Sequence, residues 1–373
     1  IIDLKKKNFF STADEKLSPG DWKQLEEQER EIAEKIKNKH LYEHILYDCF
    51  WCLNAGMTIN KTEALKKIAS LKTSNYLKDS SLALTTEARY AFYQSNMMLA
   101  LHDNDHRLYY DYIEKIISLL EKNKLLLTEK PYGYLDMLAN RANASSFLQK
   151  DEVFFETIKK IRSFPSTIPE ADIPLVNMRV FCYAEGMEFF YLCKNGYFKK
   201  ALEQLPQLIK GLNTFKTQLD TANKKIFRHI ISLVYFSNGR FKEALIWQNI
   251  LINEENTTAL RYDIDVITRL LNIIVHCELN NWELVPGLVK AYKKHIENTG
   301  HKYEMVLVII KHLESLIING ENLYKEKRFF TALAEKLNPI LQDPAEKRML
   351  NTFNAAWWLE SKIKETTMEN ASK

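Results

Sequence analysis

The sequence predicts an all-α fold in which helix hairpins stack into a solenoid. Glycine and proline are scarce, with 10 and 9 among 373 residues, whereas sheet-rich folds need many of both in their turns. Apolar residues recur at helical spacing behind recognisable start signals, and no strand-like alternation bounded by turns stands out. Hydrophobic residues make up 46% of the chain, which indicates a folded protein.

The first and the last helix begin with the same kind of signal. Ser18-Pro19-Gly20-Asp21 supplies an N-cap, a proline at the first helical position and an acid in the first turn. Apolar residues then follow at helical spacing through Ile36. Asp343-Pro344 repeats the start before a helix that contains Trp357 and Trp358. We expect this last helix to cover the final repeat, because a solenoid end otherwise exposes an apolar face.

A stretch near the middle of the chain predicts a tight turn between two helices. Asn238-Gly239 ends a helix, since glycine readily takes the left-handed conformation that a helix end requires. Phe241 begins the next helix and can fold back between the two helices. Ala244 lies about one turn further on, where a small side chain lets antiparallel helices cross closely.

The same pattern recurs along the chain. Gly196, Phe198 and Ala201 repeat it in register, and a third copy has Asn280 in place of glycine. With two fainter copies, the turns fall at residues 105, 151, 196, 239 and 280, with spacings of 46, 45, 43 and 41. Further hairpins are expected around residues 58–64 and 327–332. A self-similar period of this length is typical of an α-solenoid.

These residues resemble the tetratricopeptide repeat. Gly239, Phe241 and Ala244, with Tyr235 and Ser232 upstream, stand where that family has its glycine, aromatic, alanine, tyrosine and small residue. The period here exceeds the family's repeat of about 34 residues, and the terminal proline is missing after most units. The resemblance implies a right-handed α-α superhelix of about seven hairpins with a C-terminal capping helix, whose first helices line a concave face.

The chain is expected to have three parts. Residues 1–17 form an N-terminal extension, residues 18–342 the repeat array, and residues 343–373 the capping helix and tail. Three of the nine prolines fall within residues 164–175, so this stretch cannot be helical throughout. We interpret it as a loop between repeats, with a hinge between two sub-arrays as the alternative.

Charge and cysteine content argue against several classes of partner. The net charge is +4 with lysine and glutamate interspersed, whereas nucleic-acid binding needs a concentrated basic face. No apolar run approaches the roughly 20 residues of a membrane span, so no membrane insertion is expected. Five cysteines without framework spacing predict free, buried thiols and a reducing compartment, and hence a cytoplasmic location.

Two short motifs have a chemical interpretation and a structural alternative. His40-Leu41-Tyr42-Glu43-His44 fits His-x-x-Glu-His, in which two histidines hold zinc and Glu43 acts as a base. No third ligand is identifiable, and the alternative is that His40 and His44 share the helix face of Tyr47 and Trp51. Cys49-Phe50-Trp51-Cys52 matches a redox motif, but it lies within a helix with no strand before it. We therefore predict structural thiols there.

Polar residues on otherwise apolar first helices predict a binding site. Arg141 lies 10 residues before the turn at 151, and Arg228 and Arg269 each lie 11 residues before theirs. Three guanidinium groups at nearly one register would form a ladder that grips carboxylates or backbone carbonyls of an extended peptide. Their polar neighbours are Asn140, His229 and Asn272. The alternative is that these arginines are solvated or paired within the chain.

The repeat pattern favours a non-enzymatic scaffold that binds a protein or an extended peptide along a concave face, without metal or cofactor. Nucleotide-binding glycine loops are absent from the sequence, as is the Gly-x-Ser-x-Gly motif of serine hydrolases. The first alternative is a ligand- or peptide-sensing regulatory module of a larger signalling protein. The second is a zinc hydrolase that uses His40, Glu43 and His44. A homodimer through the solenoid ends is a further expectation.

Overall fold

The computed structural model describes residues 19–55, 61–167, 173–253, 261–300 and 302–373, and these form helices without any strand. The chain divides into two compact units, residues 1–169 and residues 170–373. The boundary falls within the proline-rich stretch 164–175, whose residues 168–172 lie outside the described part. A hinge at this stretch stays a prediction, as does the 1–17 extension, which also lies outside the described residues.

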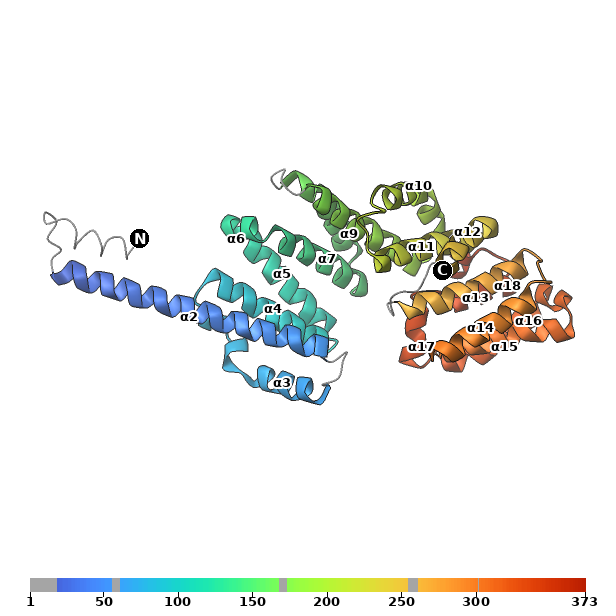
Figure 1. Cartoon of the computed structure of the whole chain (residues 1–373), viewed down its shortest axis with the longest axis horizontal. Helices are drawn as coiled ribbons and strands as arrows, with labels where there is room; N and C mark the ends of the chain where they lie inside the picture. The colour runs from blue at the N-terminus through green and yellow to red at the C-terminus, as the bar shows by residue number, and fades with distance from the viewer. Residues whose placement is uncertain (1–18, 56–60, 168–172, 254–260, 301) are drawn as a thin grey trace. The chain divides into compact units, whose positions relative to one another are not determined.

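Unit 1 is a stack of helix pairs (Figure 1). The long helix α2 packs against α3 and α4, α4 pairs with α5, α5 packs on α7, and α7 pairs with α8. The helices of unit 1 are α2 (Pro19–Ala55), α3 (Lys61–Thr73), η1 (Asn75–Leu77), η2 (Ser80–Leu82), α4 (Thr86–His102), α5 (His106–Lys122), α6 (Lys124–Glu129), α7 (Pro131–Phe147), α8 (Asp151–Ser163) and η3 (Phe164–Thr167).

Unit 2 continues the series of pairs and adds a C-terminal segment. Its pairs are α9–α10, α11–α12, α13–α14 and α15–α16. Its helices are α9 (Ile173–Lys194), α10 (Phe198–Thr214), α11 (Thr221–Ser237), α12 (Phe241–Asn253), α13 (Tyr262–Glu278), α14 (Val285–Thr299), α15 (Glu304–Asn319), η5 (Glu321–Lys325), α16 (Lys327–Ile340), α17 (Pro344–Met349), α18 (Ala355–Ile363) and α19 (Met368–Ala371). With α2–α3, α4–α5 and α7–α8, the described residues therefore form seven pairs, which confirms the predicted all-α repeat.

The five predicted turns share one backbone geometry. Each contains a single residue with positive φ, and these residues are Asn104, Gln149, Gly196, Gly239 and Asn280. In every turn the next N–H donates to the carbonyl oxygen five residues earlier, at 2.8–3.0 Å, as Arg240 N does to Tyr235 O. This hydrogen bond closes a Schellman motif, which satisfies carbonyls at the helix end. The glycines at 196 and 239 therefore reflect a turn geometry that two asparagines and a glutamine also adopt.

The side chains around these turns pack as predicted. Phe241 begins α12, and its ring centroid lies 5.7 Å from that of Phe236 at the end of α11. Ala244 and Ala201 are fully buried, which is consistent with close crossing of the paired helices. The predicted turn near residues 327–332 lies slightly earlier, since η5 precedes α16, which begins at Lys327. Residues 58–60 of the predicted 58–64 hairpin lie outside the described residues.

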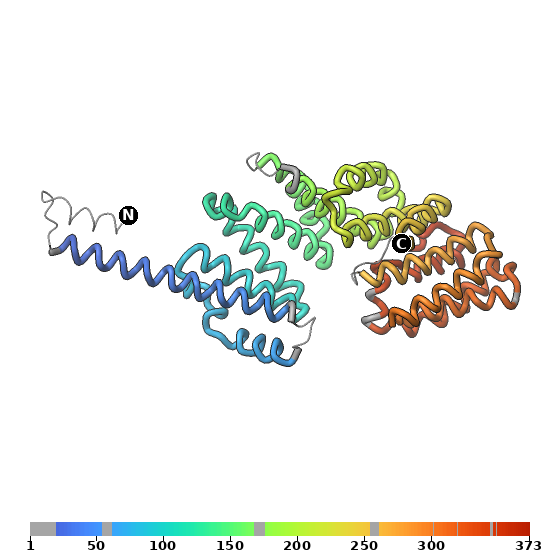
Figure 2. Tube along the Cα trace, viewed as in Figure 1, coloured from blue at the N-terminus to red at the C-terminus, as the bar shows by residue number. Residues whose placement is uncertain are grey.

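The C-terminal segment, residues 344–373, reaches further than the predicted cap. α18 packs on α16 of the last pair, and Trp358 is buried against Phe330 there. The segment then continues to the first pair of unit 2, where α19 packs on α10 and Trp357 contacts Phe198. Figure 2 shows this trace running back beside the earlier helices of the unit. The segment thus covers the final pair and also crosses earlier pairs.

Candidate functional site

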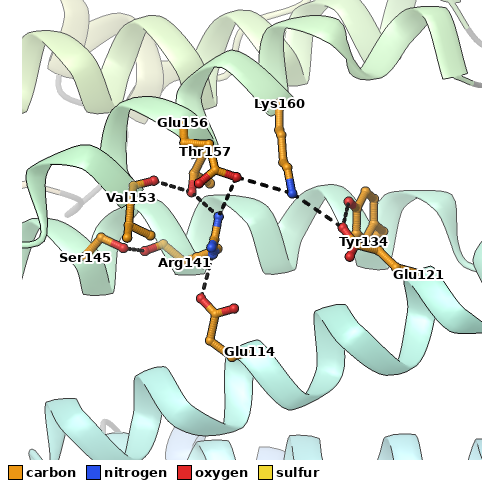
Figure 3. A network of polar contacts seen from close by, with 9 residues as sticks. All are labelled: Glu114, Glu121, Tyr134, Arg141, Ser145, Val153, Glu156, Thr157 and Lys160. Carbon is orange, nitrogen blue, oxygen red and sulfur yellow. Dashed lines mark hydrogen bonds and ion pairs between the residues drawn. The ribbon is translucent and has the colours of Figure 1, made fainter.

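Arg141 is held inside unit 1 (Figure 3). It lies on α7, its Nε donates to Glu114 Oε1 at 2.6 Å, and its Nη1 donates to Thr157 Oγ1 at 2.9 Å. Glu156 Oε1 lies 3.8 Å from Arg141 Nη1. Only 12% of the Arg141 side chain is exposed. The guanidinium group therefore ties α5, α7 and α8 together. Asn140, beside it on α7, is half-buried.

Arg228 and His229 occupy adjacent positions on α11. Arg228 is half-buried and interacts within the chain. His229 is buried, and its Nε2 lies 3.0 Å from the backbone carbonyl oxygen of Thr352. Burial lowers the pKa of His229. His229 therefore connects α11 to the C-terminal segment.

Arg269 and Asn272 lie on α13, which is the most deeply buried helix of unit 2. Arg269 is half-buried, and burial lowers its pKa. The Asn272 side-chain amide is buried, 3.4 Å from Gln248 Oε1 and 3.4 Å from Asn249 Oδ1 on α12. Asn272 therefore joins two helices of neighbouring pairs.

The structure brings only part of the predicted ladder into one unit. Arg141 belongs to unit 1, whereas Arg228 and Arg269 belong to unit 2. A common peptide-binding role for the three arginines therefore stays a prediction. Burial and internal hydrogen bonds give Arg141, His229 and Asn272 a structural part in their units.

The His-x-x-Glu-His motif lies within the long helix α2. Its histidines His40 and His44 are followed on the same helix by Tyr47 and Trp51, both of which are exposed. Among the residues that the structure describes, no group of three His, Cys, Asp or Glu side chains is arranged to hold a metal ion. The motif thus lies on a helix, as expected. In the described part of the chain, no further side chains join it to form a set of three metal ligands.

The cysteines are free thiols, as predicted. Cys49 and Cys52 lie inside α2 and are buried, and Cys193 and Cys277 are buried as well. Cys182 is only half-buried. Burial raises the pKa of Cys49 to about 11, so this thiol is protonated at neutral pH. The Cys-x-x-Cys motif is therefore structural.

The candidate binding site is a hollow on one face of unit 2. The first helices α9, α11 and α13 meet the C-terminal segment on this side, which we call the first-helix face. A cavity of about 270 Å³ lies between these helices and Asn351 and Thr352. A second cavity of about 180 Å³ adjoins it and shares Cys193, Leu233 and Asn351 as lining residues. The two cavities together form the hollow.

One wall of the hollow is apolar and its opposite edge is polar. Phe190, Ile226, Ile230 and Leu233 supply the apolar wall, and Phe190 and Ile226 are only half-buried. Arg261, Asp263 and Asn351 supply polar groups at the other edge. An apolar wall with a few polar groups is typical of ligand pockets.

The polar edge is organised by a forked ion pair. Arg261 Nε donates to Asp263 Oδ1 at 2.9 Å, and Arg261 Nη2 donates to Asp263 Oδ2 at 2.7 Å. Thr352 Oγ1 also donates to Asp263 Oδ2, at 3.2 Å. Burial alone would raise the pKa of Asp263, but the hydrogen bonds from Arg261 and Thr352 outweigh burial and lower it. The carboxylate is thus ionised and fixes the start of α13 to the C-terminal segment.

A buried ion pair joins two of the first helices, α11 and α13. Lys225 Nζ on α11 lies 2.9 Å from Asp265 Oδ2 on α13, and their side chains are 6% and 7% exposed. Charges this well buried are stabilising only when they are paired. The pair therefore links α11 to α13.

The sequence pattern of arginines on the first helices did not predict this hollow. Arg261 precedes α13, and Asn351 lies about 90 residues further along the chain. The half-buried apolar residues on α9 and α11 look like ordinary core positions in the sequence. Only the return of the C-terminal segment brings these groups together, and no local pattern encodes that return.

No protein-family model and no curated protein matches this chain. Among solved structures, the chain is similar to the apo form of the quorum sensor NprR from B. thuringiensis, with a TM-score of 0.51 and 14% sequence identity. The similarity covers 90% of this chain and 94% of the NprR chain. At this identity it shows the fold alone, and it supports an all-α helical repeat.

No helix of the described residues is both long enough and apolar enough to cross a membrane.

Proposed function

We propose that this chain is a non-enzymatic, tetratricopeptide-like helical-repeat module that binds a peptide or an extended segment of a partner protein on the first-helix face of unit 2. The observation that carries the proposal is that this face already holds a polypeptide segment. Thr352 and Lys362 of the C-terminal segment are hydrogen-bonded there to His229, Asp263 and Glu278, while α18 and α19 of the same segment pack on the second helices α16 and α10. A surface with these donors, acceptors and apolar contacts is suited to a second segment beside the first.

The hollow supplies what a bound peptide needs. An apolar side chain of the peptide would contact Phe190 and Ile226, whose surfaces are only half-buried. Its backbone would exchange hydrogen bonds with the exposed Asn351 amide, which both donates and accepts. Its carboxylate groups would meet Arg261, whose guanidinium group retains donors beyond those used by Asp263. Affinity would come from burial of a few anchors, as at other protein–peptide interfaces.

A sensing role is the second candidate, and the similarity to NprR favours it. NprR is a quorum sensor, and its apo form has an arrangement of helices like that of this chain. In a sensing role, the bound peptide would be the signal and the chain a regulatory module. The ladder of Arg141, Arg228 and Arg269 is a separate candidate for the gripping residues and is tested by the same measurement.

The proposal is tested by selecting peptides from a random display library on the immobilised full chain and measuring their affinity by fluorescence anisotropy. Two variants disturb the hollow: Ile226→Glu places a charge on its apolar wall, and Asn351→Trp blocks its rim from an exposed position. Ile246→Glu is the matched control, because Ile246 is 60% exposed on the second helix α12 of the same pair.

We expect the dissociation constants of the selected peptides to rise about tenfold or more in both hollow variants and to stay unchanged in the control. Equal binding by all three variants would move the site away from the hollow. Arg228→Glu and Arg269→Glu would then show whether the ladder is the site instead. A library that yields no binding peptide would count against the function itself.

A further inference from the structure

The first half of α2 extends beyond α3 and α4, on which the second half of this helix packs (Figure 1). Every residue from 26 to 37 is exposed, so none of the described helices covers this part of α2. The stretch is about 18 Å long at a rise of 1.5 Å per residue. Most helices in proteins are stabilised by packing an apolar face on a neighbour. This part of α2 therefore offers a surface to a partner.

An apolar stripe runs along one side of this surface. Ile32 is 46% exposed and Ile36 is 52% exposed, and residues four apart lie on the same side of a helix. Tyr47 follows Ile36 after eleven residues, or about three turns, and is 67% exposed. We call Ile32, Ile36 and Tyr47 the α2 stripe. A second helix laid along the stripe would remove these three side chains from water.

The charges of α2 change sign along the helix. Residues 26–34 contain five glutamates and one arginine, whereas residues 35–39 contain three lysines and no acid. Lys35 pairs with Glu31 of its own helix at 2.6 Å, an exposed contact of the kind that contributes little. A parallel copy of α2 would place glutamates beside glutamates. An antiparallel copy places the glutamates beside the lysines, so charge complementarity selects a second copy of this chain in that orientation.

One register of the antiparallel pair satisfies both the stripe and the charges. With Ile32 of one copy opposite Ile36 of the other, Glu29 falls opposite Lys39, and Glu31 falls opposite Lys37. Two-fold symmetry repeats each of these contacts, because residue i of one copy meets residue j of the other and the reverse. The register therefore gives two isoleucine pairs flanked on each side by two glutamate–lysine pairs.

We propose that this chain forms a homodimer in which the first halves of two α2 helices pack antiparallel in this register. Tyr47 of each copy lies beside the start of the other copy's α2. Because α2 belongs to the first pair of the array, the interface lies at an end of the solenoid, where the sequence predicts a homodimer. The dimer belongs to unit 1 and does not depend on peptide binding by unit 2.

Sedimentation equilibrium of the full chain between about 1 and 100 µM tests the proposal, because an interface of one helix pair is small and reversible. We expect a monomer–dimer equilibrium within this range. Ile32→Glu should raise the dissociation constant at least about tenfold, since it places a charge in the stripe. Leu125→Glu is the matched control, because Leu125 is 70% exposed on α6 of the same unit and should leave the equilibrium unchanged.

Charge reversal tests the orientation. Lys37→Glu combined with Lys39→Glu places acids opposite the glutamates of the second copy, so it should weaken the dimer about fivefold or more at low salt. A chain with Glu29→Lys and Glu31→Lys should restore the dimer when mixed with it. The proposal is overturned if the chain stays monomeric at every concentration, if the dimer survives Ile32→Glu, or if the lysine reversal has no effect. Peptide affinity in the hollow should be unchanged in all these variants, so failure of the dimer leaves the proposed function intact.

Discussion

His229 Nε2 on α11 lies 3.0 Å from the carbonyl oxygen of Thr352, 123 residues further along the chain. Because a carbonyl oxygen only accepts, Nε2 carries a proton in this contact. The other ring nitrogen, Nδ1, lies 3.5 Å from Thr268 Oγ1. One buried imidazole therefore bridges a first helix, its neighbour α13 and the C-terminal segment.

This contact predicts that acid destabilises unit 2. Burial lowers the pKa of His229 in the folded state below its ordinary 6.5, so the unfolded chain binds more protons as the pH falls below about 6.5. The contribution of neutral His229 to the unfolding free energy is thus complete above that pH. It is lost as the pH falls through the folded-state pKa. Urea unfolding between pH 7.5 and pH 5 measures the slope of the unfolding free energy against pH. His229→Gln, which keeps a side-chain N–H but does not titrate, should reduce it.

The pH dependence of the unfolding free energy that remains in His229→Gln reports other buried or half-buried imidazoles of unit 2. Burial also lowers the pKa values of His276, His295 and His312. A slope identical to that of the wild-type chain would show that His229 does not contribute to the pH dependence.

Two glycines with the same backbone conformation test whether the C-terminal segment lies on the α9–α10 turn. Gly196 and Gly239 both have φ of +73°, so alanine costs about 1 kcal/mol of backbone strain at either position. A Cβ at Gly196 would lie 2.5 Å from Ser372 Cβ, whereas a Cβ at Gly239 meets nothing within 4 Å. Gly196→Ala should therefore lower the unfolding free energy more than Gly239→Ala, and should speed amide exchange in residues 366–373. Equal effects would place the segment elsewhere.

The ion pair between Lys225 and Asp265 predicts a non-additive double mutant. Lys225→Met leaves a buried carboxylate unpaired and should cost about 3–5 kcal/mol of the unfolding free energy. Lys225→Met combined with Asp265→Leu removes both charges and should recover most of that loss. Urea unfolding of the two single variants and the double variant measures the coupling. Additive losses would show that the pair does not act as one unit.

The contacts of Arg141 predict that this residue stabilises unit 1. Arg141→Ala removes two hydrogen bonds and leaves Glu114 without its guanidinium partner, so it should cost about 1.5–3 kcal/mol of the unfolding free energy. Arg240→Ala is the control, because its ion pair with Glu243 is exposed and should be worth under about 1 kcal/mol. If Arg141→Ala had as little effect as the control, the network in Figure 3 would not stabilise the unit.

The repeat could be predicted from the sequence because its turns are local. A helix end, a left-handed residue and the next helix start all lie within about ten residues, as at Tyr235–Ala244. The turns predicted at 196, 239 and 280 coincide with the left-handed residues. Those predicted at 105 and 151 lie one and two residues after Asn104 and Gln149, where no glycine marks the turn. Local chemistry therefore determined the architecture of most of the chain.

The candidate site could not be predicted in the same way, because its contacts join distant residues. Thr352 and Glu278 acquire their roles only when residues 344–373 fold back, across separations of 123 and 84 residues. The nearly equal register of Arg141, Arg228 and Arg269 depended on a turn at residue 151. The left-handed residue of that turn is Gln149, so Arg141 lies 8 residues before it, whereas Arg228 and Arg269 lie 11 before theirs. Register does not fix exposure either. Arg141 illustrates this, since acidic neighbours on α5 and α8 enclose it.

The most direct test of binding at the first-helix face is hydrogen–deuterium exchange of the full chain with and without a selected peptide. We predict slower exchange in α9, in α11 and in residues 350–354 when the peptide is bound, with no change in the second helices α10 and α12. Protection confined to unit 1, or to the second helices of unit 2, would contradict binding at this face.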